Sequence, residues 1–270
     1  MERARRANPS SSRAATTEPR QNAESARLAA IHRDAAEGFC TNDAEDAQLT
    51  AVGGKDATKY GELTPQGFYA LAHHIGLRAD DSFYDAGSGL GRLVLQAARD
   101  FGVREACGIE LASSRHALAL RNLERESADV ARRVKLIEGD CADRELWALH
   151  LADVSVIFIS NLLFDAALNQ RLLLCIEELA PRARVVATLL PIADCGLTDF
   201  AEPREIFGLE TSWMAPKPAL ANATTLRPGS RVYLYRRKEA SAAALSAPES
   251  REYPESANNK KPPRCVFFQD

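Results

Sequence analysis

The chain has 270 residues, of which 46% are hydrophobic and 26% are charged, and its formal net charge is −3. This length allows one full-sized hydrophobic core with some chain to spare. The slightly acidic balance excludes a protein that holds nucleic acid through its overall electrostatic field. No uninterrupted apolar run is long enough to cross a bilayer, so we expect no membrane partner.

The six cysteines are scattered along the chain, and no two of them form a C-x-x-C pair. This spacing argues against a zinc site, and we predict no bound metal. Their apolar or mixed surroundings are typical of reduced thiols in an intracellular protein.

The two ends of the chain are predicted to be disordered tails. Residues 1–21 carry five arginines among small polar residues, a composition found in organelle transit peptides and in plain basic tails. Glu2 and Glu18 favour the plain tail. Residues 239–270 are rich in Ala, Ser, Pro and charge, which disfavours a packed structure.

The middle of the chain begins with helical patterns. A short helix is expected over about 22–37, followed by a polar, glycine-containing stretch that runs to Lys59. After a loop, apolar residues at helical spacing predict a second helix over about 66–75.

From residue 82 onwards, short apolar runs alternate with helical patterns. Strands are expected at 82–86, 106–111, 134–140, 154–160, 184–190 and, late in the chain, 230–237. Helices are expected at 90–102, at 113–123 with Ser113 as its cap, and at 167–180. Repeated strand–helix units predict an α/β fold with a doubly wound, mostly parallel sheet. Ligands on such sheets bind beyond the carboxyl ends of the strands.

The stretch FYDAGSGLGRLVLQAA places three glycines directly after the first strand. A glycine-rich turn between a first strand and its helix typically binds a nucleotide. Gly87, Gly89 and Gly91 give G-x-G-x-G, and Arg92 stands where the dinucleotide fingerprint G-x-G-x-x-G has its third glycine. Asp85 ends the strand, where a carboxylate would repel a pyrophosphate but attract the positive charges of S-adenosylmethionine. The pattern therefore favours S-adenosylmethionine.

Carboxylates also follow the next two strands. Glu110 can accept hydrogen bonds from the ribose hydroxyls of an adenosine cofactor. Asp140 can accept the adenine amino group, with Cys141 beside the ring. A helix cap for Asp85 or a solvated strand end for Glu110 is the simpler alternative for each residue alone. Three carboxylates at three successive strand ends favour the cofactor site.

The fourth strand ends in Ser160 and Asn161, where an acceptor would meet the methyl group. The Asn161 carbonyl can accept a hydrogen bond from an amine, and Phe164 can wall the channel. The alternative is that Asn161 caps the following helix. The residues themselves leave these two interpretations open.

The segments KYGELTP, FYDAGSGLGRLVLQAA, GIELA and VIFISNLLF, in this order, resemble the disruptor-of-telomeric-silencing family. These are histone lysine methyltransferases that lack a SET domain. The resemblance covers about residues 59–190 and, more weakly, the segments TSWMAPKP and VYLYRR. It implies a Rossmann-like class I methyltransferase fold, S-adenosylmethionine as cofactor, a core histone lysine in the nucleosome as substrate, and a nuclear location.

The resemblance also implies a domain layout and roles for single residues. A helical extension and cofactor-covering loop would occupy 22–78, and the methyltransferase domain 79–238. The implied catalytic residues are Asn161, Tyr60 and Trp213, with Asn161 and Trp213 lining the lysine channel. The implied cofactor-binding residues are Tyr60, Glu62, Thr64, Asp85, Gly87, Gly89, Gly91, Arg92, Glu110, Asp140 and Cys141, with Glu62 on the methionine amino group.

Some positions depart from the family's pattern. Arg92 stands where the family often has glutamine, Cys141 replaces an aromatic residue, and Val232 stands near the place of a channel tyrosine. The long basic segment that some members use to grip DNA is missing. Only the tails carry basic clusters, such as Lys260 and Lys261, so we expect at most weak DNA contact through them.

Three alternatives to a histone methyltransferase remain at this stage. The first is a lysine methyltransferase of a non-histone protein in the cytoplasm or an organelle. The second, an amino-methyltransferase of nucleic acid bases, is disfavoured because Leu162 and Leu163 follow Asn161 where those enzymes often have two prolines. The third is a non-catalytic module that binds the cofactor and recruits partners.

Overall fold

The computed structural model describes residues 26, 30, 33–192, 197–214 and 229–238. The tails predicted at 1–21 and 239–270 lie outside the described residues. Of the helix expected over 22–37, the described residues 26, 30 and 33–37 are helical.

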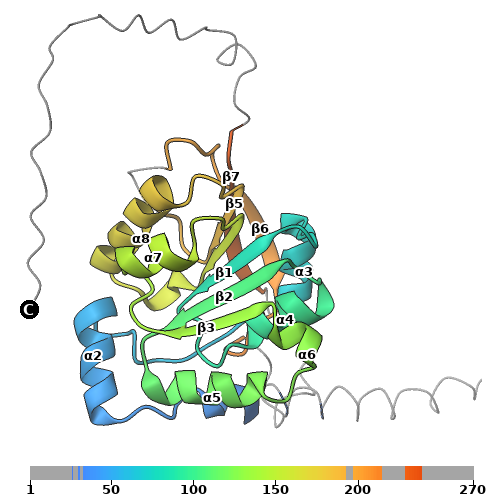
Figure 1. Cartoon of the computed structure of the whole chain (residues 1–270). Helices are drawn as coiled ribbons and strands as arrows, with labels where there is room; N and C mark the ends of the chain where they lie inside the picture. The colour runs from blue at the N-terminus through green and yellow to red at the C-terminus, as the bar shows by residue number, and fades with distance from the viewer. Residues whose placement is uncertain (1–25, 27–29, 31–32, 193–196, 215–228, 239–270) are drawn as a thin grey trace, which may run out of the picture. The chain divides into compact units, whose positions relative to one another are not determined.

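Strands from the described part of the chain form one seven-stranded sheet (Figure 1). They are β1 (Ser82–Ala86), β2 (Glu105–Glu110), β3 (Val134–Glu138), β4 (Val156–Ile159), β5 (Val185–Thr188), β6 (Arg204–Leu209) and β7 (Ser230–Arg236). Their order is β3-β2-β1-β4-β5-β7-β6. The pairs among β1 to β5 are parallel, and β7 runs antiparallel to both β5 and β6.

Helices cover both faces of this sheet. They are α2 (Asp43–Gly53), α3 (Pro65–Ile75), α4 (Arg92–Asp100), α5 (Ser113–Leu123), α6 (Ala128–Ala131), α7 (Arg144–His150) and α8 (Ala166–Leu179), with a 3-10 turn, η1, at Asn161–Leu163. α3, α4 and α6 pack on one face, and α7 and α8 pack on the other (Figure 1).

The sheet separates two hydrophobic clusters because neighbouring strand residues point to opposite faces. In β1, Phe83 belongs to the cluster under α3 and α4, whereas Tyr84 belongs to the cluster under α7 and α8. All four residues of β4 are buried, as its almost continuous apolar sequence predicts for a central strand.

The strand order confirms the predicted fold class, a doubly wound Rossmann-like methyltransferase sheet with a late antiparallel strand. The chain runs outward through β1, β2 and β3 and then returns to β4 beside β1. This reversal makes the crevice between the carboxyl ends of β1 and β4 the expected ligand position.

Five elements were not predicted: α2, α6, α7, the 3-10 turn η1 and the antiparallel strand β6. α2 occupies the stretch that was expected to be irregular, and it begins with a capping box. Asn42 Oδ1 accepts from the backbone nitrogens of Ala44 and Glu45, while Glu45 accepts from the Asn42 nitrogen at 3.0 Å. The helix was missed because Leu49 and Val52 are its only large apolar residues, which is too few to mark an apolar face at helical spacing. The predicted cap at Ser113 is also wrong, because Ala112 holds the cap position of α5.

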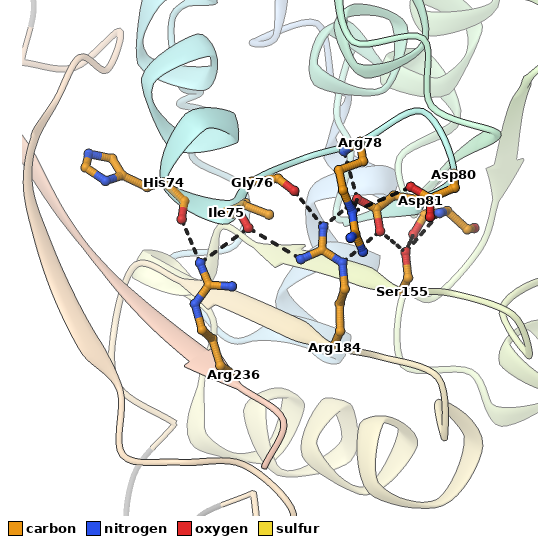
Figure 2. A network of polar contacts seen from close by, with 10 residues as sticks. His74, Ile75, Gly76, Arg78, Asp80, Asp81, Ser155, Arg184 and Arg236 are labelled. Atoms are coloured by element: carbon orange, nitrogen blue, oxygen red, sulfur yellow. Dashed lines mark hydrogen bonds and ion pairs between the residues drawn. The ribbon is translucent and has the colours of Figure 1, made fainter. Parts of the chain in front are cut away.

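The amino ends of β1, β4 and β5 are tied together at the edge of the sheet opposite the crevice. Asp81, Ser155 and Arg184 each lie directly before one of these strands and form one hydrogen-bonded network (Figure 2). Arg184 also donates to the carbonyl of Gly76, which ends α3, at 2.9 Å.

Within the described residues, no helix has the length and apolar character needed to span a membrane.

Candidate active site

A cavity of about 380 Å³ lies at the carboxyl ends of the parallel strands. One wall comes from the segment 38–60, which contains α2 and which we call the covering segment. Of the residues predicted from the sequence, eight line this cavity: Tyr60, Gly87, Gly89, Glu110, Asp140, Cys141, Phe164 and Trp213. The other six do not line it: Glu62, Thr64, Asp85, Gly91, Arg92 and Asn161.

The glycine turn passes between two aromatic rings. Gly87 and Gly89 have φ angles of +77° and +54°, in the left-handed region that favours glycine. A Cβ atom on Gly87 would lie 3.1 Å from Cζ of Phe164, and one on Gly89 would lie 2.7 Å from Cε2 of Tyr60. The turn therefore needs glycine both for its backbone conformation and for the rings that press against it.

Asp85 is buried beneath this turn with 4% of its surface exposed. Among the described residues, none donates a hydrogen bond to its carboxyl group. Burial, together with the nearby carboxylates of Glu110 and Glu62, raises the pKa of Asp85 well above its ordinary value. A carboxyl group in this state gains from a positive charge placed above it.

Glu110, the last residue of β2, links the turn to the start of α5. Its Oε2 accepts from the backbone nitrogen of Gly89 at 2.8 Å, and its Oε1 accepts from that of Ala112 at 2.9 Å. Arg115 Nη1 lies 4.0 Å from the same Oε1. Each carboxylate oxygen keeps one lone pair, so the group can accept two further hydrogen bonds.

Asp140 and Cys141 follow β3 and line the cavity. Asp140 accepts from the Ala142 nitrogen at 2.9 Å and forms an ion pair with Arg171. Burial raises the pKa of the Cys141 thiol well above its ordinary value, so this thiol is neutral at physiological pH. Its backbone carbonyl accepts from Trp147 Nε1 at 2.7 Å, which fixes the loop on the buried cluster.

Glu62 lies beside the cavity in a polar cluster. Its Oε2 accepts from the Tyr60 hydroxyl at 2.9 Å, and its Oε1 accepts from Arg92 Nη1 at 2.5 Å. Arg92, which stands where the family often has glutamine, also forms an ion pair with Glu37 at 2.8 Å. Together with Thr64, Glu62 and Arg92 line a second space of about 40 Å³.

Thr64 and Trp213 have different structural environments. Thr64 caps α3, because its Oγ1 accepts from the Gly67 nitrogen at 3.1 Å. Trp213 packs on Gly61, where a Cβ atom would lie 2.6 Å from its ring, and 38% of its surface is exposed at the mouth of the cavity.

The side chain of Asn161 is held in a cluster behind the cavity wall. Its Oδ1 accepts from the backbone nitrogens of Leu189 and Leu190 at 3.0 and 2.9 Å. Its Nδ2 donates to Asn169 Oδ1 at 2.9 Å and to the Leu190 carbonyl at 3.2 Å. The amide therefore uses its full hydrogen-bonding capacity to join β4, α8 and the end of β5.

Within the described part of the chain, no group of three or more His, Cys, Asp or Glu residues could hold a metal ion. The four cysteines in this part, Cys40, Cys107, Cys141 and Cys175, are free thiols.

A family model described as "Histone methylation protein DOT1" matches residues 46–202. The chain belongs to this family. The match begins inside α2 of the covering segment and includes the glycine turn and the strands β1 to β5.

Curated relatives of this DOT1-family chain include an H3 lysine-79 specific histone-lysine N-methyltransferase from Eremothecium gossypii. It is 32% identical over 146 residues, which are 52% of this chain and 25% of that protein. A protein-lysine N-methyltransferase from Saccharolobus islandicus is 32% identical over 109 residues, 40% of this chain and 62% of that protein. The chain thus spans less than two thirds of either relative.

Among solved structures, an RNA methyltransferase from Salinibacter ruber in complex with S-adenosyl-L-homocysteine is 19% identical, with a TM-score of 0.43. The alignment covers 69% of this chain and 95% of that one. A TM-score of this size supports no conclusion about function, and the fold assignment stands on the strand order.

Sequence reasoning missed Arg115 and Glu45 in this DOT1-family chain. Arg115 lines the cavity, and Glu45 of α2 accepts hydrogen bonds from Ser114 at the start of α5. A capping box at Asn42 and Glu45 was a readable signal for the second residue. Nothing in the sequence marked Arg115, because its partners are backbone carbonyls far away in the chain.

Proposed function

We propose that this chain is an S-adenosylmethionine-dependent methyltransferase that modifies a lysine side chain of a protein. The observation that carries the proposal is the buried Asp85 beneath the glycine turn, a carboxyl group without a hydrogen-bond partner among the described residues. Such a group suits a ligand that is both cationic and able to approach the backbone closely.

The residues present fit this cofactor. The cavity volume of about 380 Å³ lies in the range usual for small-molecule sites. We assign the ribose hydroxyls to the two free lone pairs of Glu110 and the adenine ring to Asp140 and Cys141, which line the same cavity. S-adenosylmethionine supplies an electrophilic methyl group on a sulfonium centre. Asp85, which loses its proton when a cation binds, and Glu62 provide the negative charge that holds the methionine end of the molecule.

The acceptor side of the cavity is apolar. Phe164 lies against the glycine turn, and the half-exposed ring of Trp213 stands at the mouth beside the covering segment. A lysine side chain has an ordinary pKa of about 10.4 and must lose its proton before it can react. An apolar channel disfavours the charged ammonium form and leaves a neutral amine at the reacting position.

Asn161 does not line the cavity, so it acts on the channel indirectly. Its hydrogen bonds fix the ends of β4 and β5, and the neighbouring residues Ser160 and Leu162 line the cavity. We therefore infer that Asn161 positions the channel wall rather than the amine itself.

The proposed substrate is a core histone lysine, presented on a nucleosome in the nucleus. Membership of the DOT1 family and the activity for which its fungal relatives are named support this choice. We place the methyltransferase domain at 79–238, the covering extension at 22–78 and weak DNA contacts in the basic tails. A non-histone protein lysine is the second candidate, because the relative from Saccharolobus islandicus is named simply as a protein-lysine methyltransferase.

Transfer of a radiolabelled methyl group tests the proposal. Purified full-length protein is incubated with labelled S-adenosylmethionine and, separately, nucleosomes, free histones, total cell protein and DNA. Label on a histone lysine supports the first candidate, and label on other proteins alone supports the second. Label on DNA alone, or no label on any substrate while the cofactor binds, contradicts lysine methylation. The Glu110→Gln variant is the negative control, because it weakens the ribose contact.

A further inference from the structure

Arg115 is a buried side chain that holds both ends of the covering segment. Its Nε donates to the carbonyl of Gly38 at 2.9 Å, and its Nη2 donates to the carbonyl of Thr58 at 2.7 Å. Its guanidinium carbon also lies 5.2 Å from the centre of the Tyr60 ring. One charged group thus satisfies two backbone carbonyls that are 20 residues apart, and it packs on the ring that covers the glycine turn.

The other side of the same guanidinium faces Glu110. Arg115 Nη1 lies 4.0 Å from Glu110 Oε1, and the two side chains are each 5% exposed. The Glu110 carboxylate in turn holds the Gly89 nitrogen. Arg115 therefore stands between the covering segment and the carboxylate assigned to the ribose.

A second anchor binds the covering segment to the residue before Arg115. Glu45 of α2 accepts from the Ser114 nitrogen at 2.6 Å and from the Ser114 hydroxyl at 2.7 Å. Glu45 is 8% exposed, and these hydrogen bonds lower its pKa against the opposing effect of burial. The segment is consequently fixed at two successive residues of α5, only four and five positions after Glu110.

We propose that Arg115 is a positioning residue that couples cofactor binding at Glu110 to closure of the covering segment. A ligand that hydrogen-bonds to Glu110 fixes the carboxylate, the carboxylate fixes the guanidinium, and the guanidinium fixes the carbonyls of Gly38 and Thr58. Such coupling is reciprocal: the factor by which the bound cofactor favours the closed segment is also the factor by which closing the segment raises the affinity for the cofactor. A change that loosens the segment therefore weakens cofactor binding. The inference rests on the proposed function, since it takes an adenosine cofactor as the ligand.

Hydrogen exchange and calorimetry on the full-length chain test this coupling, with S-adenosylhomocysteine as the probe. In the wild type, the ligand should slow amide exchange across residues 38–60. Arg115→Met keeps an unbranched side chain but removes all donors. We expect it to bind the ligand about tenfold or more weakly, the scale of lost bonds from a charged group. At ligand saturation, the ligand should no longer slow amide exchange at residues 38–60 of this variant, but it should still slow exchange at the glycine turn. Arg121→Met, on the exposed face of the same helix, is the matched control and should behave like the wild type.

The outcomes separate the coupling from the proposed function. If Arg115→Met keeps wild-type affinity and wild-type slowing of exchange at 38–60, the coupling is wrong while the cofactor assignment stands. If the wild type does not bind the ligand, the proposed function fails and the coupling fails with it. Glu45→Gln is the second variant in case Arg115→Met does not fold. It should speed exchange at 38–60 and weaken binding, and faster exchange with unchanged affinity would refute the coupling.

Discussion

Asp81 and Arg184 form a two-pronged ion pair at the amino ends of β1 and β5 (Figure 2). Arg184 Nε donates to Asp81 Oδ1 at 2.8 Å, and its Nη2 donates to Oδ2. The Asp81 side chain is 3% exposed, and the Ser155 hydroxyl donates to it at 2.8 Å. This pair joins two non-adjacent strands and the end of α3, which makes it a stability feature of the sheet.

Replacement of Asp81 should therefore destabilise the whole domain. Asp81→Ala leaves Arg184 without its carboxylate in a partly buried place, so we expect a loss of about 3 kcal/mol in the free energy of unfolding. Urea denaturation measures the loss. Asp153→Ala, which removes the exposed partner of Arg182, is the control and should cost less than about 1 kcal/mol. Equal losses in the two variants would contradict the assigned role of Asp81.

The same pair predicts acid sensitivity. Burial opposes ionisation of Asp81, but the hydrogen bonds from Arg184, Ser155 and Arg78 outweigh it and hold the pKa of this carboxyl below its ordinary value. A lowered folded-state pKa adds stability above the unfolded pKa of about 3.9, and this stability is lost as pH falls through the folded pKa. Asp81→Asn should unfold with a weaker dependence on pH in this acidic range than the wild type. An unchanged pH profile would show that Asp81 titrates alike in both states.

The glycine turn should fail for a steric reason as well as a conformational one. Gly89 and Gly76 both have left-handed backbone conformations, with φ of +54° and +68°, but a Cβ atom meets Tyr60 only at Gly89. Alanine at either position should cost about 1–2 kcal/mol of stability for its backbone conformation. Only Gly89→Ala should also lose at least tenfold in affinity for S-adenosylhomocysteine, because its methyl group displaces the Tyr60 ring. Calorimetry on both variants decides this, and similar affinities would refute the steric account.

Cofactor binding should release a proton from Asp85. Burial raises the pKa of this carboxyl in the free protein, and a cation above the glycine turn lowers it again. Below the raised pKa the free carboxyl is protonated, so binding releases a proton and affinity increases as pH rises towards that pKa. Calorimetry in buffers of different ionisation enthalpy measures the release. Asp85→Asn, which cannot titrate, should bind more weakly and without this proton; a variant that still releases it would assign the proton to another group.

Asn161 should matter for stability first. Asn161→Ala leaves the nitrogens of Leu189 and Leu190 without their acceptor, so we expect a loss of about 3 kcal/mol in the free energy of unfolding. Asn122→Ala is the control and should cost about 1 kcal/mol, because the Asn122 side chain donates to the Leu90 carbonyl at 3.1 Å and otherwise accepts only a long, exposed hydrogen bond from Arg125 at 3.5 Å. Unchanged stability with a strongly reduced rate of methyl transfer would instead give Asn161 a direct role at the amine.

Most strands of the sheet could be predicted from the sequence because they are short, apolar and separated by helical patterns. β1 was predicted at its observed limits, Ser82–Ala86. The sequence also indicated the cavity residues at or after strand ends, such as Glu110 and Asp140. β6 was missed because four of its six residues are exposed, so it lacks the apolar run of the central strands.

Contacts between distant residues were beyond sequence reasoning. The Asn161 amide looked free to face the cavity, but its partners at Leu189 and Leu190 come from another strand. Arg92 looked like a variant of a cofactor-binding position, yet it pairs with Glu62 and Glu37. In both cases the residue type was informative, and the geometry depended on chain segments 28 to 55 positions away.

The covering segment also has a consequence for how the protein folds. The segment leaves the ribosome before the helix that anchors it. Gly38 is bound by Arg115, which lies 77 residues later in the chain, and Glu45 is bound by Ser114, which lies 69 residues later. Contacts at such separations form slowly because a long loop must close first. Folding of the sheet through β2 and α5 must therefore precede docking of α2, and a nascent chain that is still missing α5 has no place for its own capping box helix to bind.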